Sequence, residues 1–388
     1  MRTGIAVVLA AGVVAGSMAF AKGVTPERPK TAGVSDTQRD DKAPLIQLAI
    51  LLDTSNSMDG LIDQARSQLW KIVNDLARAR RDGAPARFEV ALYEYGNTRL
   101  TPASGWVRRV LAFTTDLDRV SEELFALKTS GGDEYCGTVL QASLDELEWS
   151  TADRDLRVVF IAGNEPFTQG PVDFHPVCRR AHQKGIFVNT VHCGTLAEGA
   201  TTGWRDGAVL ADGAFAAIDM NRAVVHIEAP QDAEIARLGM ELNKTYLPYG
   251  SVGEASQQRQ VTQDTYAQQQ TGGLMSRSVT KANRLYSNSG WDLVDAVREG
   301  RADVTKLEKE ALPAEMRGLT PQQRKDLVAA KAKERAGIQE QINTLNAARE
   351  RHVATVRARS ARKDDDSLDS VMTAALRAQA ATKGIALD

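Results

Sequence analysis

Between residues 45 and 245, short apolar runs alternate with stretches in which apolar residues recur at helical spacing. The first run, 46–52, is apolar at every position except Gln47, as expected of a strand that is covered on both faces of its sheet. The stretch 61–80 places Leu61, Ala65 and Leu69 on one helical face. This alternation predicts an α/β fold with a doubly wound, mostly parallel sheet flanked by helices. Further strands are expected at 87–95, 107–113 (a sheet edge), 157–162, 186–192 and 213–218, and further helices at 117–128, 138–149, 176–184 and 231–244.

After residue 250 this rhythm is lost and a helical extension is expected. The stretch 256–271 is rich in Gln, which indicates a helix lying along the surface. Farther on, Pro321 fits the first turn of a long helix whose N-cap is Thr320. A thin apolar stripe predicts that this helix packs on another element or forms a short coiled coil. The stripe consists of Leu327, Ala330, Ile338, Ile342 and Leu345.

The first 44 residues have the pattern of an export signal and a leader. Arg2 precedes an apolar run and then Ala19-Phe20-Ala21, so residues 1–21 are interpreted as a secretory signal peptide. The polar stretch 22–44 is typical of a flexible leader. No later stretch approaches a transmembrane span, and we expect an exported protein, most simply a periplasmic one. The mature chain would then comprise an α/β domain (45–250), a Gln-rich extension that packs on it (251–291) and a charged helical tail (292–388).

Composition narrows the possible partners. The chain has 388 residues, 25% of them charged, with a formal net charge of −2, and it lacks the basic character that nucleic-acid binding requires. Its Cys residues are Cys136, Cys178 and Cys193, all expected near the carboxyl ends of strands. In an exported chain they allow one disulfide, which would brace the loops there, with the pairing left open. The alternative is that they are buried free thiols.

The most informative motif is an Asp-x-Ser-x-Ser turn that directly follows the first strand. Asp53, Ser55 and Ser57 place three oxygen side chains at alternate positions where open α/β sheets bind ligands. Ligands that are all oxygens suit a hard cation such as Mg²⁺. The alternative interpretation is that Ser57 or Asp59 caps the helix that begins near Gly60.

Residues 45–245 resemble the von Willebrand factor type A (VWA) domain, and the Asp-x-Ser-x-Ser turn resembles its metal-ion-dependent adhesion site. The resemblance implies that Asp53, Ser55 and Ser57 hold a divalent cation, most simply Mg²⁺, with Mn²⁺ or Ca²⁺ possible. It also implies a protein partner, which would place an acidic residue on the cation. The chain is therefore expected to be an exported, metal-dependent interaction module and not an enzyme.

Two loops depart from the family pattern. After Gly131-Gly132, where the family has a Thr, this chain has the acidic pair Asp133-Glu134. After the central strand, where the family has an Asp, it has Asn164 followed by Glu165. The expected ligands are therefore Glu134 and Asn164, with Asp133 and Glu165 as less certain additions. These variant loops, with Gly163-Asn164-Glu165-Pro166-Phe167 and Gln263-Asp264, also resemble an exported bacterial subgroup of such domains.

Two other functions compete with this interpretation. The first is a periplasmic scaffold that acts through its C-terminal helices, with a vestigial metal site. The second, less favoured, is a hydrolase. The five His residues form no metal-binding pair, and neither a G-x-S-x-G nucleophile turn nor a glycine-rich phosphate loop is present.

Overall fold

A six-stranded sheet forms the centre of the computed structural model, which describes residues 43–220, 226–359 and 368–387. The strands lie in the order β5-β4-β1-β6-β7-β8, and β5 alone runs antiparallel to its neighbour. The predicted doubly wound sheet, with the strand near residue 107 at its edge, is confirmed. The expected signal peptide and nearly all of the leader lie outside the described residues. The strands are β1 (Leu45–Asp53), β4 (Arg87–Tyr95), β5 (Val107–Thr114), β6 (Leu156–Gly163), β7 (Ile186–Cys193) and β8 (Phe215–Ile218).

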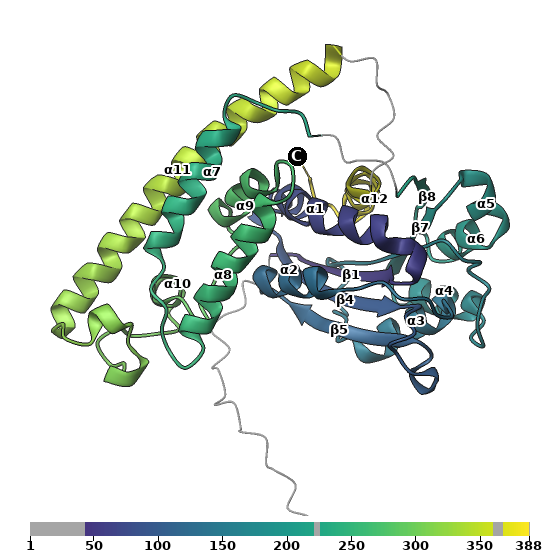
Figure 1. The fold of residues 1–388 in the computed structure, drawn as a ribbon, viewed down its shortest axis with the longest axis horizontal. Helices are drawn as coiled ribbons and strands as arrows, with labels where there is room; N and C mark the ends of the chain where they lie inside the picture. Colours follow the sequence, from purple (N-terminus) through teal and green to yellow (C-terminus); the bar gives the residue numbers. More distant parts are fainter. Residues whose placement is uncertain (1–42, 221–225, 360–367, 388) are drawn as a thin grey trace, which may run out of the picture. The chain divides into compact units, whose positions relative to one another are not determined.

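Strand β1 is apolar from Leu45 to Leu52 apart from Gln47, because the strand is buried on both faces. Ile46, Leu48 and Ile50 face one hydrophobic core, while Ala49 and Leu51 face the other. Helices α1, α2 and α12 cover the first face, and α3, α4 and α6 cover the second (Figure 1). The helices inserted between the strands are α1 (Asp59–Leu76), α2 (Leu117–Ala126), α3 (Cys136–Glu146), α4 (Phe174–Gln183), α5 (Leu196–Thr201) and α6 (Trp204–Val209).

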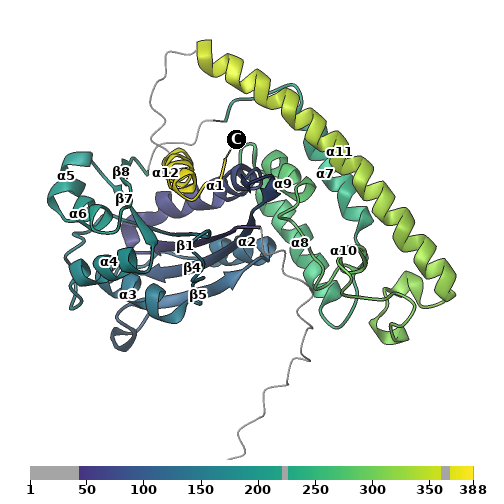
Figure 2. The same ribbon diagram turned by 180° about the vertical axis from the view of Figure 1, so that it is seen from behind.

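Several elements were not predicted from the sequence. They include the short β2–β3 hairpin (Arg80–Arg81 and Ala84–Pro85), α5, α6 and α9, whereas α10 and α12 lie within the segment 292–388 that was expected to be helical. Of the helices that follow the sheet, α7 to α11 lie beside it, with α9 in contact with α1, α7, α8 and α11, while α12 packs against α1 on the first face of the sheet (Figures 1 and 2). They are α7 (Asp232–Leu242), α8 (Gly253–Gln268), α9 (Gly273–Ala282), α10 (Leu293–Arg298), α11 (Pro321–Arg359) and α12 (Leu368–Thr382).

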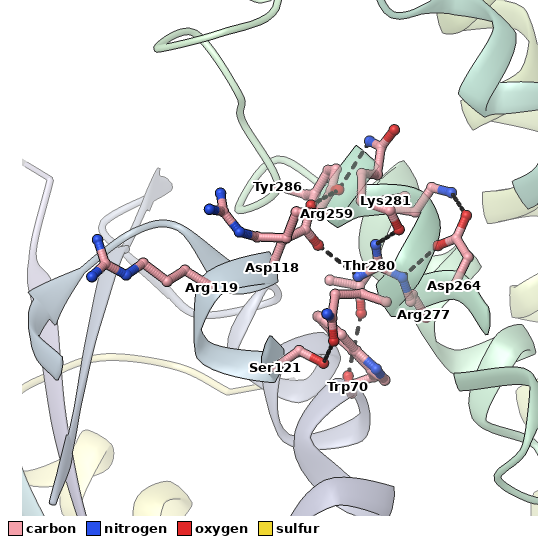
Figure 3. A network of polar contacts seen from close by, with 12 residues as sticks. Trp70, Asp118, Arg119, Ser121, Arg259, Asp264, Arg277, Thr280, Lys281 and Tyr286 are labelled. Carbon is pink, nitrogen blue, oxygen red and sulfur yellow. Dashed lines mark hydrogen bonds and ion pairs between the residues drawn. The ribbon is translucent and has the colours of Figure 1, made fainter. Parts of the chain in front are cut away.

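A buried polar network fixes α8 and α9 to the α/β domain (Figure 3). The Arg277 side chain of α9 is fully buried and donates to Asp118 of α2 at 2.7 Å and to Asp264 of α8 at 2.5 Å. Its guanidinium also lies 4.6 Å from the ring centroid of Trp70 in α1. The Gln-rich helix α8 packs on the domain through one face, where Gln263 accepts a hydrogen bond from Ser121.

Helix α11 begins as predicted and packs within the same chain. Thr320 and Gln323 exchange hydrogen bonds between side chains and backbone N–H groups, which satisfies donors at the start of the helix. Ile342 is fully buried in the main core. Arg335 is also buried and donates to Asp292 at 2.7 Å and to Asp295 at 3.0 Å. Two arrangements were predicted for this helix, packing on another element or a short coiled coil. The structure shows α11 packed on neighbouring helices and shows no coiled coil among the described residues.

The last described segment returns to the sheet. Leu368, Met372 and Leu376 of α12 enter the core that also contains β1 and α1. Gln379 and Asn189 of β7 exchange hydrogen bonds at 3.1 and 2.7 Å. The C-terminal segment therefore contributes part of the domain core. None of the described helices combines the length and apolar character needed to cross a membrane.

Candidate metal centre

The candidate site lies at the carboxyl end of β1, in the middle of the sheet. The chain continues to β4 on one side of β1 and to β6 on the other, which is the arrangement that opens a ligand crevice in such sheets. Asp53 is fully buried, and its Oδ1 accepts a hydrogen bond from the Ser55 N–H at 2.7 Å. The Ser55 and Ser57 Oγ atoms are 3.4 Å apart. The turn thus holds its three oxygen side chains together.

The alternative interpretation, in which this turn caps a helix, is wrong. The residue that precedes α1 is Met58, and no side chain makes a capping hydrogen bond there. Ser55, which precedes the short 3₁₀ turn at Asn56–Met58, makes none either. Asp59 instead accepts a hydrogen bond from the hydroxyl of Thr129 at 2.5 Å. The Ser side chains are therefore free of a capping role.

Glu134 comes to Asp53 from the loop before α3. Its backbone N–H donates to the Gln169 side chain at 2.8 Å, and its own side chain is turned inward, with the residue only 6% exposed. Gly96, at φ 78°, makes the approach possible, since a Cβ there would lie 2.8 Å from both Asp53 Oδ1 and Glu134 Cγ. Both side chains therefore approach the same glycine, and the charge of Glu134 acts on Asp53.

The loop after β6 completes the arrangement. Asn164 Nδ2 donates to Ser57 Oγ at 3.2 Å, which ties the third loop to the first. Glu165, the next residue, is near enough for its charge to act on Glu134. Asp133 is different: it is exposed and accepts a hydrogen bond from the Tyr135 hydroxyl at 3.1 Å. We call Asp53, Ser55, Ser57, Glu134 and Asn164 the oxygen cluster, and the structure does not bring Asp133 to it.

Three buried oxygens of the oxygen cluster have no hydrogen-bond partner among the described residues. They are Asp53 Oδ2, Glu134 Oε2 and Asn164 Oδ1. Buried polar atoms are costly without a partner, so such a group calls for a ligand. Within the described part of the chain there is no group of three or more His, Cys, Asp or Glu side chains that could hold a metal. The set is instead two carboxylates, two hydroxyls and an amide, which fits a hard cation.

The pKa shifts of the Asp53 and Glu134 carboxyl groups also favour cation binding. Burial, followed by the charge of Glu134, raises the pKa of Asp53 well above its ordinary value. Burial also raises the pKa of Glu134, although contacts with Asp53 and Ser55 oppose the shift. Without a cation the buried pair therefore favours a protonated state. A bound divalent cation would replace that proton and let both groups ionise.

The predicted disulfide is wrong. Cys136, Cys178 and Cys193 are all buried free thiols. Cys193 belongs to the core on one face of the sheet, whereas Cys136 and Cys178 belong to the core on the other. Burial raises the pKa of the Cys178 thiol to about 12, and the pKa of the other two is also raised. The sequence placed all three Cys residues near the same edge of the sheet. It did not show that Cys193 lies on the opposite face from its expected partners.

Sequence reasoning also missed three residues that shape the oxygen cluster: Gly96, Gln169 and Tyr95. Tyr95 lies beneath Asp53, and its hydroxyl donates to the Ala162 carbonyl at 3.0 Å. A Cβ added to Gly163 would lie 2.5 Å from that hydroxyl and 3.1 Å from Asp53 Oδ2. The sequence does carry a signal for this close packing, because one glycine directly follows β4 (Gly96) and another ends β6 (Gly163). A residue with a side chain would not fit at either position.

Residues 47–202 match the family model described as the von Willebrand factor type A domain, so this part of the chain is a VWA domain. No curated protein matches the chain. The VWA domain of SpRpn10 is a similar solved structure, with 13% identity and a TM-score of 0.34 over 47% of this chain and all of that one.

Two other solved structures are also similar. BatB from Bacteroides thetaiotaomicron has 13% identity and a TM-score of 0.35 over 45% of this chain and 90% of that one. Proximal thread matrix protein 1 from the mussel byssus has 12% identity and a TM-score of 0.32 over 46% of this chain. Its structure is described as having a zinc-occupied metal-ion-dependent adhesion site, and the match spans 42% of its length.

Proposed function

We propose that the VWA domain of this chain binds a divalent cation, Mg²⁺ in the first place, and through it a protein partner. VWA domains generally act as interaction modules. The observation that carries the proposal is the convergence of Asp53 Oδ2, Glu134 Oε2 and Asn164 Oδ1, all buried and without hydrogen-bond partners. The hydroxyls of Ser55 and Ser57 lie beside them.

The residues of the oxygen cluster would bind the cation in two different ways. Asp53 and Glu134 supply negative charge, while Ser55, Ser57 and Asn164 supply neutral oxygens. The cation, when bound, supplies a positive charge that attracts an oxygen ligand from outside the chain. Asn164 holds Ser57 in place through its amide nitrogen, so the third loop positions the first. Gln169 positions Glu134 through the backbone.

The scaffold alternative rests on free C-terminal helices, and the structure gives it less support. The apolar stripe of α11 is already used inside the chain, since Ile342 is fully buried and Ile338 and Leu345 pack against the same core. We therefore propose that the interaction occurs at the oxygen cluster, and that the chain acts in the periplasm, as its first residues predict.

Calorimetric titration of the full chain with Mg²⁺, Mn²⁺ and Ca²⁺ tests the proposal. We expect one site per chain, lost in Asp53→Asn and retained in Asp63→Asn, which changes an exposed carboxylate of α1 that pairs with Arg66. Capture of a partner from periplasmic extract should then require the cation and fail with Asp53→Asn. A folded wild-type chain that binds none of the three cations at millimolar concentration would overturn the proposal.

A further inference from the structure

The loop after β6 carries Asn164, and the segment that joins α5 to α6 holds the residues that follow it. The indole N–H of Trp204, the first residue of α6, donates to the backbone carbonyl of Glu165 at 2.9 Å. The backbone N–H of Phe167 donates to the carbonyl of Thr202, which directly follows α5, at 2.8 Å. Two hydrogen bonds to the same stretch of chain therefore fix the loop directly after Asn164.

The side chain of Phe167 adds an apolar contact to this attachment. Its ring is fully buried and lies at a steep angle to that of Trp204, with 4.9 Å between the ring centroids. Gly207 of α6 makes room for it, since a Cβ there would lie 2.7 Å from a ring atom of Phe167. The loop after β6 is thus anchored by its own aromatic residue as well as by its backbone.

Trp204 is held in its turn by the sheet. The residue is fully buried, and its backbone carbonyl accepts a hydrogen bond from the hydroxyl of Thr190 in β7 at 2.7 Å. Strand β7 is paired with β6 as far as Gly163, the residue directly before Asn164. The indole is therefore fixed relative to the strand that leads into the loop.

We propose that Trp204 is a positioning residue of the candidate metal centre. By holding the Glu165 carbonyl it fixes the backbone next to Asn164, whose amide nitrogen then reaches Ser57 Oγ at 3.2 Å. This inference rests on the proposed function. Groups that orient metal ligands without touching the metal typically contribute about 10–100-fold to metal affinity. Because coupling between two equilibria is reciprocal, a cation bound at the oxygen cluster should also stabilise the contact with Trp204.

A matched pair of Trp→Phe variants of the full chain tests the proposal. Trp204→Phe keeps an aromatic ring beside Phe167 and removes only the indole N–H that holds Glu165. Trp149→Phe is the control, because the Trp149 indole N–H also donates to a backbone carbonyl at 2.9 Å. Trp149 lies away from the oxygen cluster, since the next residue is hydrogen-bonded to Gln47 near the start of β1.

Calorimetric titration with Mg²⁺ and urea unfolding are measured for both variants. We expect comparable losses of stability, because each variant loses a hydrogen bond of the same kind. Mg²⁺ affinity should fall by about tenfold for Trp204→Phe and by less than about twofold for Trp149→Phe. A purely structural role of Trp204 would give the loss of stability without the loss of affinity.

Fluorine NMR of the full chain labelled with fluorotryptophan gives a second readout. The resonances of Trp204 and Trp149 are assigned from single Trp→Phe variants. In the wild type, Mg²⁺ should shift the Trp204 resonance along the same saturation curve that calorimetry gives, while the Trp149 resonance stays in place. This measurement decides the question alone if Trp204→Phe does not fold, since assignment can then proceed by elimination among the other Trp residues.

The two proposals fail in different ways. Equal Mg²⁺ affinity of Trp204→Phe and Trp149→Phe, or a Trp204 resonance that Mg²⁺ does not shift, would overturn the inference while the proposed function stands. A folded wild-type chain that binds no Mg²⁺ would overturn the proposed function and this inference with it, and the titration of the wild type shows this before any variant is made.

Discussion

Asp53 and Glu134 meet at Gly96, where a single added carbon would lie 2.8 Å from a side-chain atom of each. Asp53 ends the central strand, and Glu134 lies 81 positions later in a loop, so the contact depends on the glycine that follows β4. The backbone of Gly96 has φ 78°, which an L side chain rarely adopts. This one position therefore serves both the turn and the approach of the two carboxyl groups.

Replacement of this glycine should abolish cation binding. Gly96→Ala should cost about 1 kcal/mol or more of stability from backbone strain and also push Asp53 and Glu134 apart. Gly83→Ala is the matched control, because Gly83 also has φ 78° but has open space around it. Chemical denaturation should show a loss in both variants, and calorimetry should show loss of Mg²⁺ binding for Gly96→Ala alone. Equal Mg²⁺ affinity in the two variants would contradict the assigned geometry.

Cation binding should release protons. Burial and mutual repulsion raise the pKa of Asp53, and burial raises that of Glu134, so the empty pair holds a proton that the cation displaces. Below the raised pKa, affinity should increase with pH, and above it the affinity should level off. Calorimetry in two buffers of different ionisation enthalpy measures the number of protons released. Identical observed enthalpies in both buffers, within the pH range where affinity changes, would refute the linkage.

The Arg277 network should be a major contributor to stability. Arg277→Leu leaves the buried carboxylate of Asp118 without its ion-pair partner and leaves Asp264 with Lys281 alone, and loss of one member of a buried ion pair typically costs about 3–5 kcal/mol. Arg237→Leu is the surface control, since Arg237 pairs with Glu234 at an exposed position, and it should cost less than about 1 kcal/mol. Urea unfolding measures both. A loss for Arg277→Leu as small as that of the control would show that the network is not a stabilising one.

Helix α12 should behave as part of the domain core. Leu376 is 1% exposed and packs in the same core as β1, so Leu376→Ala should cost about 2–5 kcal/mol of stability. Met240 of α7 is 45% exposed, and Met240→Ala should change stability by about 0.5 kcal/mol or less. Thermal unfolding followed by circular dichroism compares them. Similar melting temperatures would mean that α12 is dispensable.

The sequence predicted the sheet well, because its central strands are buried on both faces. A strand such as β1 then has a nearly continuous apolar run, which is typical of a strand covered on both faces. The first metal loop was also predictable, since its Asp and Ser residues follow that run directly. Glu134 and Asn164 could be proposed from the glycines beside them, while their contacts depended on the fold.

Other features could not be predicted because the sequence signal pointed elsewhere. Gln263, Asp264 and Arg277 are polar, and polar residues indicate a surface, yet pairing with one another lets them be buried. The segment after residue 367 has little helical periodicity to distinguish it from a tail, and its place in the core appears only once α1 and β1 are assembled. The faces of the sheet that the Cys residues occupy depend likewise on tertiary structure.

The most direct test of the account is a crystal structure of the full chain grown with Mn²⁺, with anomalous scattering used to locate the ion. We predict one anomalous peak among Asp53, Ser55, Ser57, Glu134 and Asn164. A carboxylate oxygen of each of Asp53 and Glu134 should either bind the ion directly, at about 2.0–2.6 Å, or accept a hydrogen bond from a water that does. Electron density that shows an ordered oxygen cluster with no Mn²⁺, at a concentration that saturates metal-binding proteins, would contradict the central claim.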